Sequence, residues 1–260
     1  MDDPLVRWEV ANGVATVVLD SPHNRNALSR RLLRDLAGAL DAATGHPDAR
    51  VIVLTGAGTV FCSGADLKEQ REANVAGSQA QPINDLPAIL MTLWTCPQPV
   101  VCRLNGPARA GGVGLLASCD LVVAPTEVTF SFTEVRLGLV PAIITVPLLR
   151  RIAPQALHRL FLTAEVFSAQ RAQEIGLVDA VAAAGELNAE VARLVSMLRR
   201  GGPQALELTK RLVPEIRSLP PEEAFARLTE LSAQRFASAE GREGLQAFAE
   251  KRDPAWVPTV

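Results

Sequence analysis

The chain has 260 residues, of which 48% are hydrophobic and 21% are charged, and its formal net charge at pH 7 is −2. These values are ordinary for a folded soluble protein, and they provide no basic stripe for a nucleic-acid partner. The longest apolar runs are far shorter than the ~20 residues of a membrane span, and the acidic start MDDPLVRWEV is unlike a secretory signal. We therefore expect a cytoplasmic protein that has neither a nucleic-acid nor a membrane partner.

Cysteine and histidine patterns argue against disulfides and metal. The four cysteines form no CxxC pair and lie in apolar or Gly-rich surroundings, so we expect reduced, mostly buried thiols. The three histidines form no HxH or HExxH motif, and no metal site is expected.

The first 180 residues alternate between predicted strands and helices. Residues 13–22 predict a strand that ends in a Ser-Pro turn, and Ser29 is typical of the N-cap of the helix that follows. The apolar face of that helix contains Leu32, Leu33, Leu36, Leu40 and Ala43. Further strands are predicted over 50–58, 99–106, 120–125 and 128–132. This alternation predicts an α/β fold.

From Glu186 onward the pattern is helical. Helices are predicted over 185–200, 203–216, 220–238 and 240–252, with breaks at the Gly and Pro residues between them. We therefore divide the chain into an α/β core, residues 1–185, and a helical C-terminal region, residues 186–260. The polar segment 70–86 predicts a mobile loop or loose helix that borders a site.

Two Gly-bearing turns, TGAGTVFCSGADLKE (55–69) and NGPARAGGVGLL (105–116), each end at a predicted helix start. Helix starts leave backbone N–H groups unpaired and carry partial positive charge. Two such turns facing each other could supply two donors to one developing oxyanion, but each could equally be only a tight connection. Asp66 and Asp120 are predicted to be structural caps or turn residues, and Asn105 to fix its own turn.

Six segments together resemble the enoyl-CoA hydratase/isomerase (crotonase) family. They are NRNALS (24–29), FCSGADLKE (61–69), NGPARAGGVGLLASCD (105–120), FTEVRLGLVP (132–141), FSAQRAQEIGLVD (167–179) and GREGLQAFAEKRDPAW (241–256). The resemblance implies a crotonase-like spiral of ββα units, a C-terminal helical trimerisation region, and a homotrimer or dimer of trimers. It also implies an acyl-CoA thioester substrate, with coenzyme A as part of that substrate and no separate cofactor.

By position in the family, the backbone N–H groups of Ala65 and Gly111 form an oxyanion hole for the thioester carbonyl, and Glu134 is the catalytic carboxylate. Gly111 and Gly112 are expected to let the thioester reach the helix start. Considered without the family, Glu134 lies in a predicted extended segment and could form a surface ion pair with Arg136. The resemblance favours the catalytic role, with a pKa raised by an apolar pocket.

Gly114 stands where hydratases of the family usually carry a further glutamate. We expect the space there to be empty, hydration of crotonyl-CoA to be weak, and Gly114→Glu to raise it. Ala110 and Ala142 stand where relatives often have glycine, and Ala142 is expected to narrow the space beside Glu134.

Cations are expected at the entrance for the phosphates of coenzyme A. The candidates are Arg25, Lys68 and Lys251, the last from the C-terminal helix of a neighbouring subunit, although each could also be a solvated surface charge. Phe236 is either an aromatic against the acyl or pantetheine chain or a core residue. The remaining predicted contacts of the substrate are Ala27, Ser63, Asp66, Leu67, Gly112, Gly114, Pro141 and Ala142.

Three functions follow as hypotheses. The first is a 2-enoyl-CoA hydratase, a lyase that stabilises a thioester enolate and has a single catalytic glutamate. The second is an isomerase that moves a double bond from position 3 to position 2, which needs Glu134 alone. The third is a CoA-thioester-binding homologue with low activity.

Overall fold

Two sheets form the frame of the computed structural model, which describes residues 3–75, 85–217 and 219–257. The larger sheet has six strands in the order β1-β2-β3-β4-β6-β9, and β5, β7 and β8 form a smaller sheet. The strands are β1 (Val6–Ala11), β2 (Val14–Leu19), β3 (Val51–Gly56), β4 (Val100–Arg103), β5 (Ala108–Arg109), β6 (Leu121–Pro125), β7 (Thr129–Ser131), β8 (Phe167–Ser168) and β9 (Ala180–Ala182). Only the β1–β2 and β7–β8 pairs are antiparallel among these described strands.

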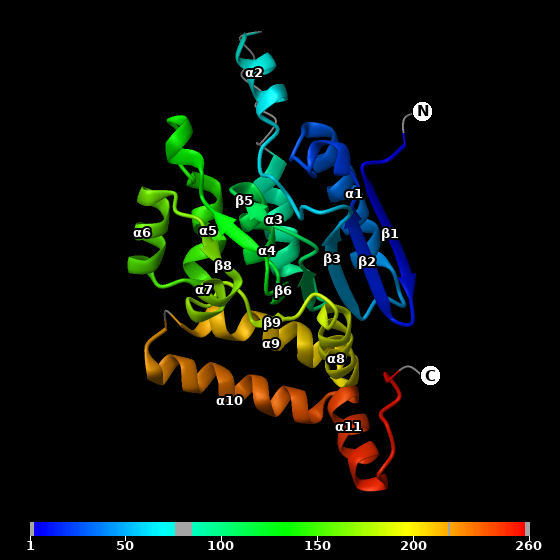
Figure 1. Cartoon of the computed structure of the whole chain (residues 1–260). Helices are drawn as coiled ribbons and strands as arrows, with labels where there is room; N and C mark the ends of the chain where they lie inside the picture. The colour runs from blue at the N-terminus through cyan, green and yellow to red at the C-terminus, as the bar shows by residue number, and fades with distance from the viewer. Residues whose placement is uncertain (1–2, 76–84, 218, 258–260) are drawn as a thin grey trace.

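Helices connect the strands and make up the C-terminal part (Figure 1). They are α1 (Arg30–Gly45), α2 (Leu67–Val75), α3 (Leu86–Thr95), α4 (Gly111–Ala117), α5 (Ala142–Arg151), α6 (Pro154–Thr163), α7 (Ala169–Glu174), α8 (Leu187–Arg200), α9 (Pro203–Ile216), α10 (Pro221–Ala237) and α11 (Ala239–Glu250). Two short 3₁₀ helices are η1 (Pro22–Asn24) and η3 (Glu134–Leu137). None of the helices in these described ranges is long and apolar enough to cross a membrane.

The first predicted helix is confirmed together with its cap and its buried face. The Ser29 hydroxyl accepts a hydrogen bond from the Leu32 backbone N–H at 3.2 Å, which satisfies one of the unpaired donors at the start of α1. All five predicted apolar residues of α1 are buried. Every residue of β3 is buried too, as expected for a parallel strand covered on both faces.

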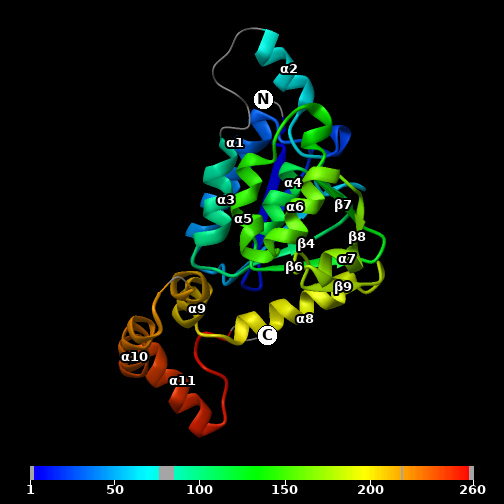
Figure 2. The ribbon, with the colours of Figure 1, turned by 90° about the vertical axis from the view of Figure 1, so that its left-hand side faces the viewer.

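Helix α8 covers one face of the larger sheet. Leu187, Val191 and Val195 pack against buried valines of β3, β4 and β6. Helix α8 therefore belongs to the core of the sheet, although the predicted boundary at Glu186 assigns it to the C-terminal region. The division into two domains stays a prediction. Helices α10 and α11 extend away from the sheet and lie at the opposite end of the molecule from α2 (Figures 1 and 2).

Some elements were not predicted, and one prediction is wrong. Strand β1 and helices α3, α5 and α6 have no counterpart in the sequence reading. Glu134 lies in the 3₁₀ helix η3 and not in the predicted extended segment. Residues two apart do not share a face there as they do in a strand, and no ion pair joins Glu134 to Arg136 within the described chain. Of the predicted loop 70–86, residues 70–75 are helical and 76–84 lie outside the described residues. The four cysteines are free and buried, as predicted.

Candidate active site

Three neighbouring chain segments run parallel to one another, and each delivers one group to the same end. Cys62 forms a parallel bridge with Ala108, and β5 pairs in parallel with β7, placing Arg109 opposite Ser131. The Arg109 backbone N–H donates to the Cys62 carbonyl at 3.0 Å. Since parallel segments end at the same edge, the residues that follow them gather there. Those residues are Ala65, Gly111 and Glu134.

Ala65 and Gly111 present backbone N–H groups that have no acceptor in the part of the chain that the structure describes. The Leu28 N–H donates to the Gly64 carbonyl, and the Leu28 carbonyl accepts from the Asp66 N–H. In such a parallel pairing the N–H of the residue between them, Ala65, points away from Leu28. Gly111 is the first residue of α4, where helix geometry leaves N–H groups unpaired. The Gly111 nitrogen lies 3.6 Å from where a Cβ on Gly64 would stand, so the two donors belong to neighbouring peptide groups.

Glu134 presents a buried carboxylate oxygen. Its Oε2 atom is inaccessible to solvent and has no hydrogen-bond partner among the described residues. Burial raises the pKa of Glu134 above its ordinary value, and a hydrogen bond from its own backbone N–H partly offsets this rise. A carboxyl group with a raised pKa can carry a proton between atoms near neutral pH.

Ala110 holds the start of α4 in a strained conformation. Its φ of +46° and ψ of −119° lie in a region that favours glycine. The Ala110 N–H donates to the Ser131 carbonyl at 3.2 Å, so the strand that leads to Glu134 also fixes the residue before Gly111. One strand thus positions both the second donor and the carboxylate.

The structure gives Gly112 a packing role that was not predicted. A Cβ there would stand 2.7 Å from both the Cβ and the carbonyl oxygen of Cys62, so this glycine lets α4 pack closely on the neighbouring segment. The contact of Gly112 with the thioester stays a prediction. Burial raises the pKa of the Cys62 thiol to about 12. The thiol therefore stays protonated near neutral pH and is not a nucleophile.

The expected empty space at Gly114 is wrong. A Cβ on Gly114 would stand 2.5 Å from Cγ2 and 3.2 Å from Cβ of Ile144, a buried residue of α5. The space is filled by Ile144, which the sequence reading did not name. The signal available was the β-branched pair Ile143-Ile144 directly after Pro141 and Ala142.

The structural aspartates are confirmed, and the role of Asn105 is corrected. The Asp66 carboxylate accepts from the N–H groups of Lys68 and Glu69, both at 3.1 Å, and caps α2. Asp120 accepts from the Val100 N–H at 2.7 Å. The Asn105 side chain does not fix its own turn but bonds Gly56, Gly58 and Val60 of the other turn, so it ties the two Gly-bearing turns together.

The predicted contacts of the substrate divide into two groups. The first lies around the donors: the Ser63 N–H donates to the Arg25 carbonyl at 3.1 Å, Ala27 is buried beside them, and Leu67 and Lys68 are exposed at the start of α2. Pro141 and Ala142 begin α5, a few residues beyond Glu134.

The second group is Phe236 and Lys251, which lie at the far end of the molecule. Phe236 belongs to α10 and Lys251 ends α11, so one chain does not bring them to Arg25 and Lys68 (Figure 1). Phe236 is 65% exposed, so the alternative of a core aromatic is wrong.

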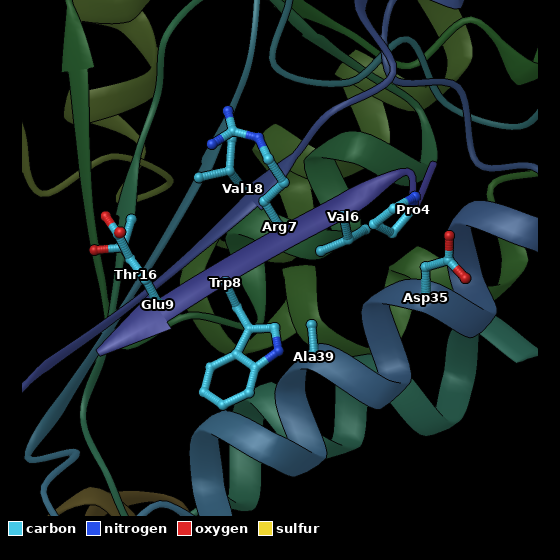
Figure 3. Close-up of a pocket in the computed structure, with 9 residues that line it drawn as sticks. All are labelled: Pro4, Val6, Arg7, Trp8, Glu9, Thr16, Val18, Asp35 and Ala39. Atoms are coloured by element: carbon cyan, nitrogen blue, oxygen red, sulfur yellow. The ribbon is translucent and has the colours of Figure 1, made fainter. Parts of the chain in front are cut away.

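A separate surface hollow of about 580 Å³ lies between β1, β2 and α1. Figure 3 shows Trp8 turned toward α1 and Ala39, with Arg7 on the opposite side of the strand. The hollow contains none of the predicted site residues. Of its charged residues, Arg7 pairs with Asp20, and Asp35 accepts from the Leu5 N–H at 2.9 Å.

Comparisons with known proteins identify the family and the fold of this chain. A family model described as enoyl-CoA hydratase/isomerase matches residues 9–258. Enoyl-CoA hydratase EchA19 of Mycobacterium tuberculosis is 32% identical over 242 residues, which are 92% of this chain and 91% of that protein. The crystal structure of human enoyl Coenzyme A hydratase domain-containing protein 3 is 29% identical and superposes with a TM-score of 0.90 over 97% of this chain and 100% of that chain. Pseudomonas aeruginosa AtuE is 32% identical, with a TM-score of 0.91 over 98% and 100% of the two chains.

Three parallel segments that end beside two backbone donors and a half-buried carboxylate form a candidate active site on a crotonase-type α/β fold. The chain belongs to the enoyl-CoA hydratase/isomerase family. The predicted family and fold class are therefore confirmed, and acyl-CoA thioesters are the class of substrate that this family binds.

Proposed function

We propose that this protein is a 2-enoyl-CoA hydratase that uses Glu134 as its proton-transfer group. The observation that supports it is the arrangement of the Ala65 N–H, the Gly111 N–H and the half-buried Glu134 carboxylate at the ends of three adjacent segments. The two N–H groups hold the thioester oxygen as negative charge develops on it. No metal or separate cofactor takes part in this proposal.

The reaction needs one carboxylate for two proton transfers. Glu134 accepts a proton from water while the water oxygen bonds to C3 of the enoyl group, and the electron pair of the double bond moves toward the thioester oxygen. The enolate so formed is held by the two N–H groups. Glu134 then returns the proton to C2, and the product is a 3-hydroxyacyl-CoA.

A double-bond isomerase is the second candidate, and the Ile144 side chain at Gly114 favours it. With that space filled by a hydrocarbon, α4 contributes no carboxylate there, and the isomerase reaction needs Glu134 alone. Glu134 would then remove a proton from C2 of a 3-enoyl thioester and return it to C4. No water is consumed in this reaction.

Product analysis after mixing the purified protein with a panel of 2-enoyl- and 3-enoyl-CoA thioesters tests both candidates. The hydratase forms a product heavier than its 2-enoyl substrate by one water, whereas the isomerase converts a 3-enoyl thioester to a 2-enoyl thioester of equal mass. Glu134→Gln should lose either reaction, and Glu127→Gln, at an exposed position before β7, should keep it. Absence of turnover across the panel, with thioester binding intact, would instead point to a binding protein.

A further inference from the structure

Helix α4 packs closely on α5 at Gly114. Ile144 is 3% exposed, and its Cγ2 atom stands 2.5 Å from the place of a Gly114 Cβ. Real Cβ atoms do not approach that closely, so any side chain at 114 requires Ile144 to move. By contrast, a Cβ on Gly38 in α1 would meet nothing within 4 Å.

Position 114 is also where the family resemblance places a further carboxylate on α4. It lies three residues beyond Gly111, and residues three apart are neighbours on a helix surface. Position 112 points instead at Cys62. The side of α4 that follows the Gly111 donor is therefore covered by a branched hydrocarbon, which offers water neither a donor nor an acceptor.

Ile144 packs on α4 and also follows Glu134 closely along the chain. The Leu139 N–H donates to the Glu134 carbonyl at 3.0 Å, and Ala142 begins α5 two residues before Ile144. A single short segment thus carries the proton-transfer group and the residue that fills the space beside Gly114.

We propose that Ile144 is a specificity-determining residue: it excludes a second carboxylate and its water from the α4 side of the site. This proposal rests on the proposed function. It means that Ile144 limits the enzyme to reactions in which Glu134 is the acting carboxylate. Gly114→Glu by itself then gives no gain in hydration, contrary to the expectation from sequence. Removing Ile144 and adding the acid together should raise the rate of water addition to short, straight 2-enoyl thioesters.

A double-mutant cycle tests the exclusion without any need for turnover. Thermal unfolding is measured for Gly114→Glu, Ile144→Ala and the double variant, with Gly38→Glu and Ile52→Ala as matched controls at an open helix position and in the buried strand β3. Gly114→Glu should lower Tm strongly while Gly38→Glu does not. Ile144→Ala should recover part of that loss, whereas Ile52→Ala should only add to it, because only contacting residues couple.

Steady-state hydration of crotonyl-CoA tests the consequence for the reaction. The double variant should exceed Ile144→Ala and the wild type by about 10-fold or more, below the 10²–10⁴-fold of a fully positioned acid or base. Equal Tm values for Gly114→Glu and Gly38→Glu would overturn the proposal. So would, where the wild type turns over a thioester of the panel, a double variant that folds and binds the thioester but hydrates no faster than Ile144→Ala.

The two proposals fail in different ways. If no variant and no wild-type sample turns over any thioester of the panel, the proposed function is wrong, and the coupling of Tm values alone decides whether Ile144 excludes the acid. If the wild type turns over but the Tm losses are additive, the function stands and the role of Ile144 is refuted.

Discussion

The Glu134 carboxyl group has two measurable consequences, one for catalysis and one for stability. Glu134→Gln should keep acyl-CoA binding and reduce turnover by ~10²-fold or more, the usual loss for a missing acid or base. Isothermal titration with a thioester and steady-state kinetics measure the two quantities separately. Turnover near that of the wild type on the true substrate would contradict the assignment, and Glu127→Gln is the control for an exposed acid.

The raised pKa of Glu134 also makes stability depend on pH in a defined direction. A pKa that is higher in the folded than in the unfolded state means that the folded protein holds more protons between the two values. The wild type therefore loses stability as pH rises from below 4.5, the ordinary pKa of a glutamate, through the higher pKa of the folded state. Glu134→Gln should be more stable than the wild type at pH 7 and lose this advantage at pH 4, as measured by urea unfolding. A constant difference between the two pH values would show that burial does not penalise this carboxylate.

Ala110 is the position where backbone strain meets the oxyanion donor. A non-glycine residue in such a conformation costs about 1–3 kcal/mol, and the greater freedom of glycine in the unfolded chain takes back about 0.4–1 kcal/mol. We expect Ala110→Gly to raise the free energy of unfolding by about 1 kcal/mol. Ala37→Gly, inside α1, should lower it by about 1 kcal/mol. Equal losses for both variants in urea unfolding would refute strain at Ala110.

Local residue roles could be predicted from sequence, and roles that depend on packing could not. Ser29 and Asp66 cap helices that begin within three residues of them, so the local pattern is enough. Gly112 and Gly114 look alike in the sequence, yet one faces Cys62 and the other Ile144. Which neighbour each glycine meets is set by how α4 docks, and that depends on residues distant in the chain.

At the scale of elements, α9 is tied to the core by one buried cation. The Lys210 side chain is 5% exposed, and its Nζ lies 2.9 Å from the Asp120 carboxylate and 3.0 Å from the carbonyl oxygens of Leu93 and Gln98. The lysine thus joins α9 to the end of α3 and to the residue before β6.

Lys210→Met should therefore destabilise the protein by about 3–5 kcal/mol, because it leaves the largely buried Asp120 carboxylate without its counter-ion. Arg211→Met is the neighbouring control: it breaks an exposed pair with Glu207 that is worth about 0.3–0.5 kcal/mol. Chemical denaturation of both variants measures the difference. A loss for Lys210→Met as small as that for Arg211→Met would show that the ion pair does not hold α9.

Elements with a long, regular pattern could be predicted, whereas short or irregular ones could not. The amphipathic α1 and the wholly apolar β3 have distinct periods, and both are found where the sequence predicts them. Strand β1 is mostly exposed on a sheet edge, so its pattern carries little apolar signal. Helix η3 has only four residues, too few for any period to identify it.

At the scale of the whole molecule, the C-terminal helices present large apolar side chains to solvent. Phe225 is 72% exposed, Phe236 65% and Phe248 85%, and all three belong to α10 or α11. These helices stand away from the sheet in both views (Figures 1 and 2). Aromatic residues exposed together at one end of a chain are typical of a surface that a partner subunit covers.

We therefore predict a homotrimer or a dimer of trimers, in which α10 and α11 of one chain reach the Arg25 and Lys68 side of a neighbour and supply Phe236 and Lys251 to its site. Light scattering at micromolar concentration should give the mass of three or six 27.7 kDa chains. A second measurement tests the shared site: co-expressed Glu134→Gln and Lys251→Ala subunits should recover more activity than either variant alone, because some mixed sites combine an intact Glu134 with a neighbour's intact Lys251. A monomer at that concentration would refute the assembly, and mixed oligomers no more active than the average of the two variants would refute the contribution of Lys251 across the interface.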